Sequence, residues 1–328
     1  MLKFGILGAA RIAPWALLEP AARRLDIDIV GVAARRHGAA DQFAAQHGIR
    51  KTYDSYEQLL ANPEIDVIYN PLPPHLHAEF SIKALEAGKH VLCEKPFAMN
   101  AGEAEAMVDA AQRSGKRIVE AFHDRYHPVF ARLLEIVDSG ALGSIGKLEA
   151  VFSHTIPPTE GEFRRIPNMG GGALMDLGCY PVHWCRSLLR AEPQVVEADA
   201  LLDANGCDEE IRATLSFGNG TVAQIESRMT PTWQYHARFI IEGERGSVVA
   251  ENSLLPHRGH SIVETIDGVM RQYTIGGGTT FDFQLAAFVE AMETGAALPT
   301  EGADPVGNMR TIDAIYAKAR VDRERLAR

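Results

Sequence analysis

Short apolar segments alternate with longer amphipathic segments along the first 122 residues. Apolar runs that end at turn residues predict strands, and longer segments with apolar residues at helical spacing predict helices. The predicted strands cover residues 3–7, 27–34, 66–70, 90–93 and 117–122, and the predicted helices cover residues 12–24, 39–47, 75–87 and 101–114. Apolar strands that alternate with helices indicate a parallel sheet with helices on both faces.

The pattern changes near His123, where we place a domain boundary. The segments predicted after it are a helix over 127–138, a strand over 147–153, a polar loop over 154–170 and a helix from the glycines at 170–172 to residue 189. Several strands follow between residues 194 and 275, and helices over 281–294 and 304–323 end the chain. Within residues 221–229, Ala223 and Ile225 alternate with Gln224 and Glu226, which is typical of antiparallel strands with one wetter face.

The composition is that of a globular protein with two ordinary domains. The chain has 328 residues, of which 46% are hydrophobic and 23% are charged, a profile that argues against disorder. Its 33 basic and 43 acidic residues give a formal net charge of −10, which argues against nucleic acid or an anionic membrane as the partner. The first residues resemble neither a signal peptide nor a membrane span, so we expect a cytoplasmic protein.

Four cysteines are present, Cys93, Cys179, Cys185 and Cys207, and none forms a CxxC pair. A large cytosolic chain rarely depends on disulfides, so free thiols packed in or near the core are expected. A zinc site made of Cys179, His183 and Cys185 is the alternative, but this spacing matches no common zinc pattern. We therefore expect no metal site.

A degenerate dinucleotide motif follows the first predicted strand. Of the pattern GxGxxG only Gly8 remains, because Ala10 and Ala13 replace the other two glycines. A generic strand-to-helix turn would explain the motif alone. Its place between a strand and a helix, with a second strand at the right distance, favours a Rossmann fold whose helix start binds the pyrophosphate. We expect Gly8, Ala10, Arg11 and Ile12 at the cofactor.

The end of the second predicted strand indicates which dinucleotide binds. NAD-specific Rossmann domains place Asp or Glu there, where it binds the ribose 2′-hydroxyl, but this chain has Arg35 and Arg36. A carboxylate would repel a 2′-phosphate, whereas a guanidinium binds it with two hydrogen bonds. The pair therefore predicts NADP rather than NAD. A solvated basic pair at a helix entrance is the alternative interpretation.

Three further positions are expected along the cofactor cleft. Asn70 ends the third predicted strand, Leu72 lies in the proline-rich turn at 71–74, and His75 follows that turn directly. Open parallel sheets bind ligands outside the carboxyl ends of their strands, which is where this turn lies. His77, two residues further on, is interpreted as mainly structural.

Four longer motifs resemble one oxidoreductase family. They read AGKHVLCEKP at 87–96, EAF at 120–122, RYHP at 125–128 and GGGALMDLGCYP at 170–181. Their order resembles that of the glucose–fructose oxidoreductase, inositol dehydrogenase and MocA family, which carries a Glu-Lys-Pro motif at the end of a Rossmann strand. The resemblance covers essentially the whole chain and is strongest to the branch that holds dihydrodiol dehydrogenase and NADP-dependent xylose dehydrogenases. Ala10 departs from the family's more usual glycine.

The resemblance implies that Lys95, Tyr180 and Asp176 are catalytic. Oxidation of an alcohol needs a general base for the hydroxyl proton, and Lys95 stands at the carboxyl end of a parallel strand. The family has His or Tyr where this chain has Tyr180, four residues after Asp176 and so on the same helix face. A nearby ammonium favours the phenolate, which suits proton transfer. A half-buried core tyrosine is the alternative for Tyr180.

Supporting roles follow from the same motifs. Glu94 is expected to position Lys95 or to contact the nicotinamide ribose, and Asp176 to orient Lys95 or the substrate hydroxyl. His183 fits a structural role and a supporting role in the site equally well. In the polar loop, Arg164, Arg165 and Asn168 are candidates for contacts with sugar hydroxyls or a carboxylate, with solvated loop charges as the more common alternative.

The resemblance implies an NADP-dependent dehydrogenase or reductase that acts on a sugar, a sugar derivative or a vicinal diol. Residues 1–123 would bind the cofactor, and residues 124–328 would bind the substrate on an α/β domain built on a large, mostly antiparallel open sheet. Two alternatives use the same fold. A redox-neutral glycoside hydrolase that retains NAD is disfavoured by the arginine pair, and a non-catalytic cofactor sensor is disfavoured because the catalytic residues are present.

The outer face of the antiparallel sheet predicts an oligomer. Phe239 and Ile241 alternate with Arg238 and Ile240, so an apolar group lies among the outward residues whichever face is buried. Scattered exposed apolar residues are common on monomers. The resemblance strengthens the prediction, because relatives pair these sheets face to face, and we expect a homodimer or a homotetramer.

Overall fold

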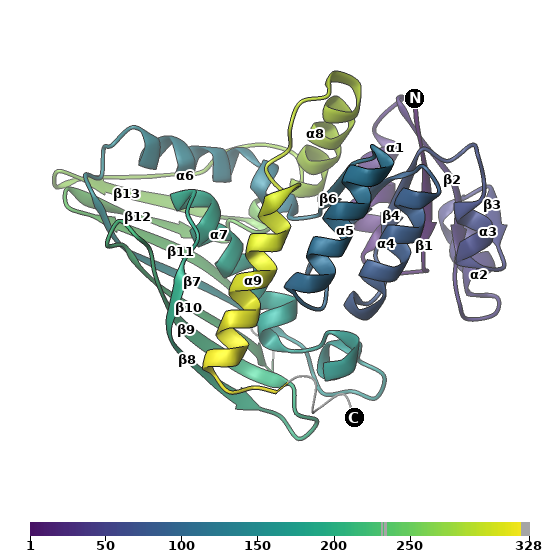
Figure 1. Cartoon of the computed structure of the whole chain (residues 1–328). Coiled ribbons are helices and arrows are strands. Elements are labelled where there is room, and N and C mark those ends of the chain that lie inside the picture. Colours follow the sequence, from purple (N-terminus) through teal and green to yellow (C-terminus); the bar gives the residue numbers. More distant parts are fainter. Residues whose placement is uncertain (231, 233–234, 323–328) are drawn as a thin grey trace. The chain divides into compact units, whose positions relative to one another are not determined.

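The computed structural model describes residues 1–230, 232 and 235–322. The chain divides into two compact units, Met1–Phe122 with Phe281–Val306 and His123–Thr280 with Gly307–Arg328. Figure 1 shows the whole chain, coloured along its sequence from the N-terminus to the C-terminus. Among the described residues, no helix combines the length and the apolar character that crossing a membrane requires.

The sheet of the first unit is parallel throughout, as the alternating pattern predicts. Its strands lie in the order β3-β2-β1-β4-β5-β6. Their bounds are β1 Leu2–Leu7, β2 Ile27–Ala33, β3 Lys51–Tyr53, β4 Val67–Asn70, β5 His90–Cys93 and β6 Ile118–Glu120. This is the Rossmann order, and it places the topological switch point, where such sheets bind dinucleotides, between β1 and β4.

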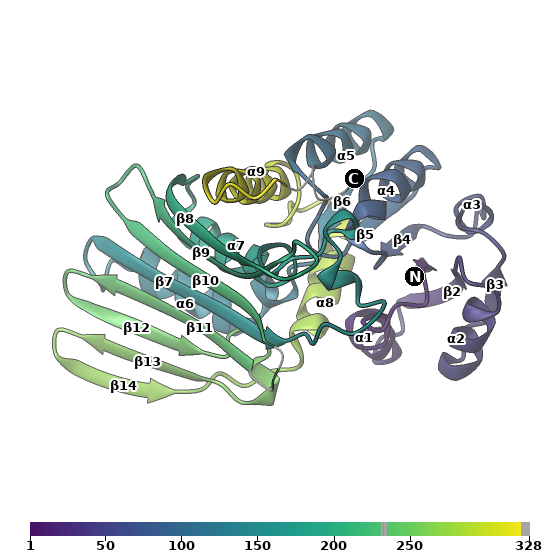
Figure 2. The same cartoon turned by 90° about the horizontal axis from the view of Figure 1, so that it is seen from below.

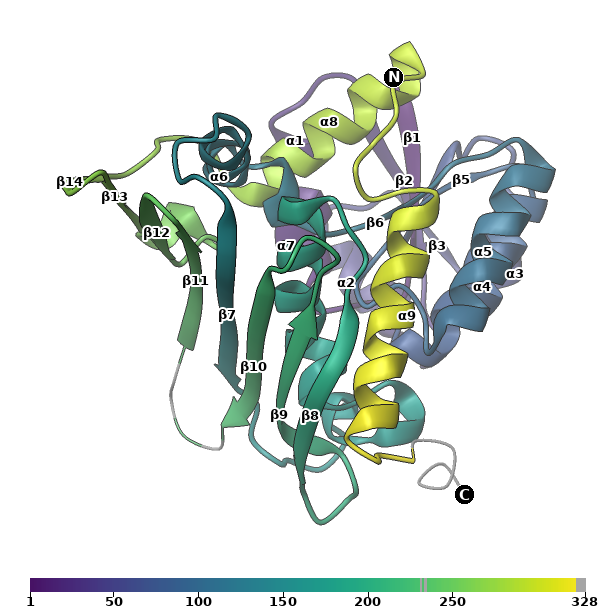
Figure 3. The same cartoon turned by 60° about the vertical axis from the view of Figure 1, so that its left-hand side comes forward.

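Helices cover both faces of the parallel sheet. They are α1 Glu19–Ala22, α2 Ala39–His47, α3 Tyr56–Leu60, α4 His77–Glu86, α5 Ala101–Ser114 and α8 Thr280–Thr294. Figure 3 shows α1 and α8 on one face and α4 and α5 on the other. The ring centroid of Phe288 on α8 lies 6.0 Å from that of Phe4 on β1, and both residues are buried. A helix from late in the sequence thus completes the core of the first unit.

Two details of the first unit differ from the prediction. The helix predicted over 12–24 begins as a π-helical turn, Pro14–Leu18, and becomes the short α1 afterwards. The hydrophobic pattern misses β3 and α3, because they have three and five residues and give no full period. A cap signal was present for α3, since the Ser55 hydroxyl accepts a hydrogen bond of 3.1 Å from Gln58 N.

The second unit is built on one sheet of eight strands, in the order β14-β13-β12-β11-β7-β10-β9-β8 (Figure 2). The bounds are β7 Ile145–Thr155, β8 Gln194–Leu202, β9 Asp208–Ser216, β10 Val222–Thr230, β11 Tyr235–Gly243, β12 Gly246–Glu251, β13 Ser261–Ile266 and β14 Val269–Tyr273. Neighbouring strands are antiparallel except β7 and β10, which pair in parallel. The prediction of a large, mostly antiparallel sheet is confirmed.

Helices cover one face of this sheet (Figure 3). They are α6 Pro128–Asp138, α7 Cys179–Leu189 and α9 Ala303–Lys318, and residue 323, the end predicted for the last helix, lies outside the described residues. The side chains of the middle strands that are buried beneath the helices are Leu148, Ala150, Phe152, Phe239 and Ile241. The intervening residues of these strands form the opposite face, which no helix among the described residues of this unit covers.

All four cysteines are free and buried, as expected of core thiols. Burial raises the pKa of Cys93 and of Cys185. His183 is also fully buried, and its ring stacks on Phe130 at 6.4 Å between centroids. Among the described residues, no three His, Cys, Asp or Glu side chains are grouped so that they would hold a metal ion.

A buried carboxyl group lies in the core of the second unit. Asp124 has no exposed surface, and its Oδ2 accepts a hydrogen bond of 2.6 Å from the Trp184 indole N–H of α7. Its Oδ1 has no hydrogen-bond partner among the described residues. Burial raises the pKa of Asp124 to about 7, although the Trp184 bond and the Arg125 charge act in the opposite direction.

We predict that Asp124 makes the stability of the fold depend on pH. Its folded-state pKa lies above the unfolded value of about 3.9, so it stabilises the fold at acid pH, and this contribution is lost as the pH rises to about 7. Asp124→Asn cannot ionise. The unfolding free energy of this variant minus that of the native protein is therefore expected to rise by a few kcal/mol between about pH 4 and about pH 8.

Urea denaturation at several pH values measures this difference. Buried histidines such as His127, whose pKa burial lowers to about 4, affect both proteins equally and cancel in the difference. Asp109→Asn, on the exposed face of α5, is the matched control. A difference that stays constant with pH would contradict the assignment.

Candidate functional site

The loop after β1 has the conformation that a dinucleotide motif requires. Gly8 has a φ of +85°, which glycine adopts without strain. A Cβ on Gly8 would lie only 3.0 Å from Leu72 Cδ2, so the turn after β4 covers this loop closely. Ala10 and Ile12 are half-buried and Arg11 is exposed. These residues precede the π-helical turn, and the N–H groups at a helix start are suited to a phosphate.

The arginine pair lies just beyond β2, and both Arg35 and Arg36 are exposed. The phenol oxygen of Tyr56 accepts a hydrogen bond from the backbone of Arg35, which fixes the chain at this point. Burial raises the pKa of Tyr56. Two guanidinium groups at the end of the second strand fit a 2′-phosphate, as the sequence predicts.

The turn after β4 is held by the side chain of Asn70. This residue has no exposed surface, and its amide donates to Ser81 Oγ at 3.0 Å and accepts from Leu72 N at 3.3 Å. Asn70 thus helps to shape the turn. In the same turn, His75 Nδ1 is buried and has no hydrogen-bond partner among the described residues. An unpartnered ring nitrogen at a strand end fits a group that bonds a bound molecule.

His77 joins the two turns at the carboxyl ends of β4 and β5. Its ring nitrogens lie 2.6 Å from Leu72 O and 2.9 Å from Pro96 O, and the residue is 1% exposed. Lys95 precedes Pro96 and is half-buried. The structural interpretation of His77 is confirmed, and the contact also shows what it supports, namely the backbone next to Lys95.

Two buried carboxylates hold the segment around Lys95 in the first unit. Glu94 is 8% exposed and accepts a hydrogen bond of 2.7 Å from the Tyr69 hydroxyl. Glu120, at the end of β6, has no exposed surface and accepts a hydrogen bond of 2.9 Å from Phe97 N. The segment around Lys95 is therefore fixed on both sides by side chains from neighbouring strands.

In the second unit, Asp176 lies on a π-helical turn, Leu174–Gly178, that leads into α7. Asp176 N donates to Gly172 O at 2.9 Å, and Asp176 Oδ2 lies 3.8 Å from Arg164 Nη1. Arg164 also donates two hydrogen bonds of 2.8 Å to Glu162. Its charge is therefore balanced by two carboxylates.

The glycine run before this turn is required by a buried carboxylate. Asp208 is 2% exposed and accepts hydrogen bonds from Leu174 N at 2.6 Å and from the Tyr316 hydroxyl at 2.9 Å. Gly172 has a φ of +126°, and a Cβ there would collide with the Asp208 carboxylate. Glycine at this position lets Asp208 reach the start of the helix that carries Asp176.

Tyr180 lies in the first turn of α7 and is 4% exposed. Its ring contacts Phe152 edge to face, with 5.6 Å between centroids, and Trp184 at 6.3 Å. Its hydroxyl lies 3.2 Å from His123 Nε2. The aromatic ring of Tyr180 is packed like that of a core tyrosine. Its hydroxyl, however, contacts the imidazole of His123, a group that can gain or lose a proton.

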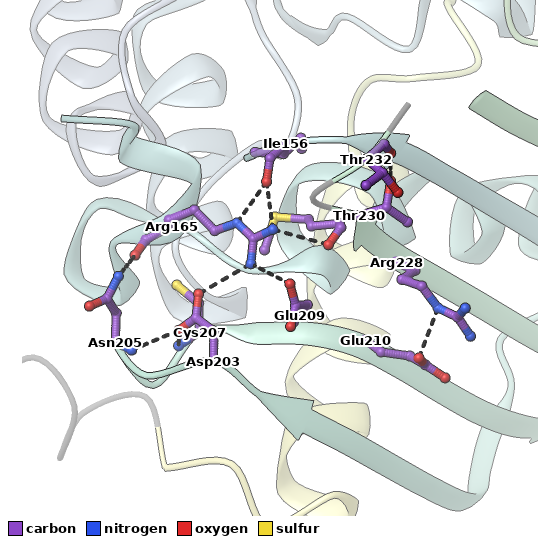
Figure 4. A network of polar contacts seen from close by, with 11 residues as sticks. Ile156, Arg165, Asp203, Asn205, Cys207, Glu209, Glu210, Arg228, Thr230 and Thr232 are labelled. Atoms are coloured by element: carbon purple, nitrogen blue, oxygen red, sulfur yellow. Dashed lines mark hydrogen bonds and ion pairs between the residues drawn. The ribbon is translucent and has the colours of Figure 1, made fainter. Parts of the chain in front are cut away.

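Arg165 is a buried charge and not a solvated one. It is 2% exposed, and its guanidinium donates to Ile156 O, to Met229 O at 3.0 Å and to the carboxylates of Asp203 and Glu209 (Figure 4). The sequence places it in a polar loop and gives no sign of this burial. Arg165 instead ties the loop to the ends of β7, β9 and β10.

Sequence reasoning assigns no role to three buried polar residues: Tyr69, Glu120 and His123. Each is a buried polar group at or near the end of a strand. A polar residue within an otherwise apolar strand is the available signal, because its burial requires a specific partner.

The comparisons agree with these observations. The GFO/IDH/MocA oxidoreductase family, described as having an NAD-binding Rossmann fold, matches residues 2–122, and its C-terminal domain matches residues 130–249. The chain belongs to this family.

Named relatives act on sugars or diols. The chain is 33% identical to a D-xylose 1-dehydrogenase (NADP(+)) of Haloferax volcanii, over 97% of each chain. It is 32% identical to a trans-1,2-dihydrobenzene-1,2-diol dehydrogenase of Xenopus tropicalis, over 70% of each chain. A solved 3-ketoreductase from Actinomadura kijaniata, in complex with NADP and TDP-benzene, is similar in structure with a TM-score of 0.88, 26% identity and 97% of each chain covered.

Proposed function

We propose that this protein is an NADP-dependent dehydrogenase or reductase that transfers a hydride between the nicotinamide and a sugar, a sugar derivative or a vicinal diol. The observation that carries the proposal is Lys95, a family motif residue whose segment is fixed at the carboxyl end of β5 by His77 and Glu120. The names of the relatives, two dehydrogenases and a ketoreductase, support the same reaction class.

NADP is the cofactor that the first unit fits. The arginine pair after β2, the positive φ of Gly8 and the unpartnered His75 Nδ1 support this choice. When bound, the nicotinamide supplies the hydride acceptor or donor. The residues that would hold NADP are Gly8, Ala10, Arg11, Ile12, Arg35, Arg36, Asn70, Leu72, His75, Glu94 and Lys95.

Proton transfer is assigned to Lys95 and Tyr180, with Asp176 as the residue that orients the substrate. The hydroxyl of the substrate must lose a proton when its carbon loses a hydride, and both side chains are able to exchange one. Glu162 and Asp176 balance the positive charge of Arg164. This arginine therefore has little net charge left with which to attract a carboxylate on a substrate. A neutral polyol is therefore favoured as the substrate over an acidic one.

The open face of the eight-stranded sheet is proposed as the interface of a homodimer or a homotetramer. Ile240, Val249 and Val263 are in register across β11, β12 and β13 and form an apolar row on this face. Ion pairs surround the row, such as Arg238 with Glu251 at 2.9 Å. A mixed surface of this kind can pair with its own copy through a two-fold axis.

We predict that Arg35→Ala combined with Arg36→Ala lowers the preference for NADP over NAD at least about tenfold, because a charge-assisted hydrogen bond contributes about 1.5–3 kcal/mol. Titrations that follow the fluorescence of NADPH and of NADH give the two dissociation constants. Arg50→Ala, which removes an exposed arginine paired with Asp28, is the control. An unchanged ratio in the double variant would remove the basis for choosing NADP.

We predict that Lys95→Met and Tyr180→Phe each lower kcat by about a hundredfold or more, the usual contribution of a positioned acid or base. Net absorbance change of the nicotinamide with a panel of sugars and diols measures turnover. The same assay excludes a redox-neutral hydrolase, which would give product without net change. Lys83→Met and Tyr53→Phe are the matched controls, and near-normal turnover in either catalytic variant would refute that residue's role.

We predict that the native protein is an oligomer at micromolar concentration and that Ile240→Lys converts it to the 35.8 kDa monomer, because a charge would be buried in the apolar row. Light scattering gives the mass. Gln42→Lys, on the exposed face of α2, is the control. A native monomer would contradict the oligomer, and an oligomeric Ile240→Lys variant would place the contact elsewhere.

A further inference from the structure

A histidine outside the family motifs contacts the hydroxyl of the proposed catalytic tyrosine. His123 is 5% exposed and begins the short helical segment His123–Tyr126. Its Nε2 lies 3.2 Å from the Tyr180 hydroxyl oxygen, and its Nδ1 lies 2.8 Å from Thr280 Oγ1. The three side chains belong to the second unit, although they are far apart in the sequence.

Either neutral tautomer of His123 can form hydrogen bonds with both Tyr180 and Thr280 in this arrangement. A neutral imidazole has one N–H and one acceptor nitrogen, whereas the two hydroxyl groups can each donate or accept. With the proton on Nδ1, His123 donates to Thr280 and accepts from Tyr180. With the proton on Nε2, Thr280 donates to His123, and His123 donates to the Tyr180 oxygen. A proton can therefore move along the three groups without leaving a buried polar atom unpaired.

The packing fixes the distance between the two rings. His123 and Tyr180 meet edge to face, with ring centroids 5.9 Å apart and an interplanar angle of 64°. Phe152 contacts the same tyrosine ring, and Thr280 has no exposed surface. The Tyr180 hydroxyl therefore has one defined direction relative to Nε2, which is what a proton relay requires.

We propose that His123 is a positioning residue for Tyr180, which it orients and from which it accepts a proton during alcohol oxidation. This inference rests on the catalytic role of Tyr180 proposed above. As the hydride leaves the substrate carbon for the nicotinamide, the substrate hydroxyl proton passes to the Tyr180 oxygen. The proton that Tyr180 held passes to His123 Nε2, and the resulting imidazolium donates its Nδ1–H to Thr280. Carbonyl reduction runs through the same transfers in reverse.

A double-mutant cycle tests this dependence. His123→Leu is expected to lower kcat at least about tenfold in the native background, because Tyr180 loses its proton acceptor. In the Tyr180→Phe background the same change is expected to have no further effect, since His123 acts only through the tyrosine. The dissociation constant of NADP should stay within about twofold in all variants.

Two further variants keep the test independent of how well His123→Leu folds. His123→Gln, whose amide can bond both neighbours but cannot hold an extra proton, is expected to recover part of the lost kcat. Thr280→Val removes the partner of Nδ1 and is expected to lower kcat by a smaller factor that also vanishes in the Tyr180→Phe background. His257→Gln, at an exposed histidine of the same unit, is the matched control.

Two outcomes would overturn the inference. One is near-normal kcat in His123→Leu and in Thr280→Val, and the other is an equal loss of kcat with and without the Tyr180 hydroxyl, as a purely structural role would give. In both cases Tyr180→Phe alone would still lower turnover, and the proposed function would stand. Near-normal turnover of Tyr180→Phe would instead refute the role of Tyr180, which is a separate result.

Discussion

The contact on which the first unit's site depends is the one that His77 makes with two backbone carbonyls. Its ring reaches Leu72 O and Pro96 O, one in the turn after β4 and one in the turn after β5. Leu72 in turn covers Gly8, and Pro96 adjoins Lys95. A single buried ring therefore connects the loop suited to phosphate with the segment that carries the lysine. Parallel strands bring these two turns to one edge of the sheet, and the contacts of His77 fix the distance between them.

In the second unit, a buried carboxylate holds the segment that carries Asp176. Asp208, at the start of β9, accepts from Leu174 N at the beginning of the turn that carries Asp176, and it also binds Tyr316 of α9. A sheet strand, a helix start and a helix near the chain's end thus meet at one group. In both units, a buried polar side chain with defined partners holds a segment that bears residues proposed to be catalytic.

Sequence reasoning predicts the regular elements well where their pattern is long. The helix at 101–114 and the strand at 90–93 have the predicted bounds, since apolar spacing and a terminal glycine mark them. The burial of Arg165 and the pairing of His123 with Tyr180 were not predictable, because both depend on residues far apart in the sequence. The proposed catalytic residues lie in motifs that the sequence shows directly, whereas some side chains that hold them, such as Tyr69, lie outside these motifs.

Both segments that lead into the proposed site helices, Pro14–Leu18 and Leu174–Gly178, are π-helical turns. Such a turn holds one residue more than an α-helical turn, and it is often found at functional sites. Deleting one residue would leave an ordinary helix, but it would rotate everything before the deletion by about 100° about the helix axis. The phosphate loop and the glycine run would then face another direction. At these two places the number of residues constrains the protein in addition to their identity, so a single insertion or deletion should change the direction that both segments face.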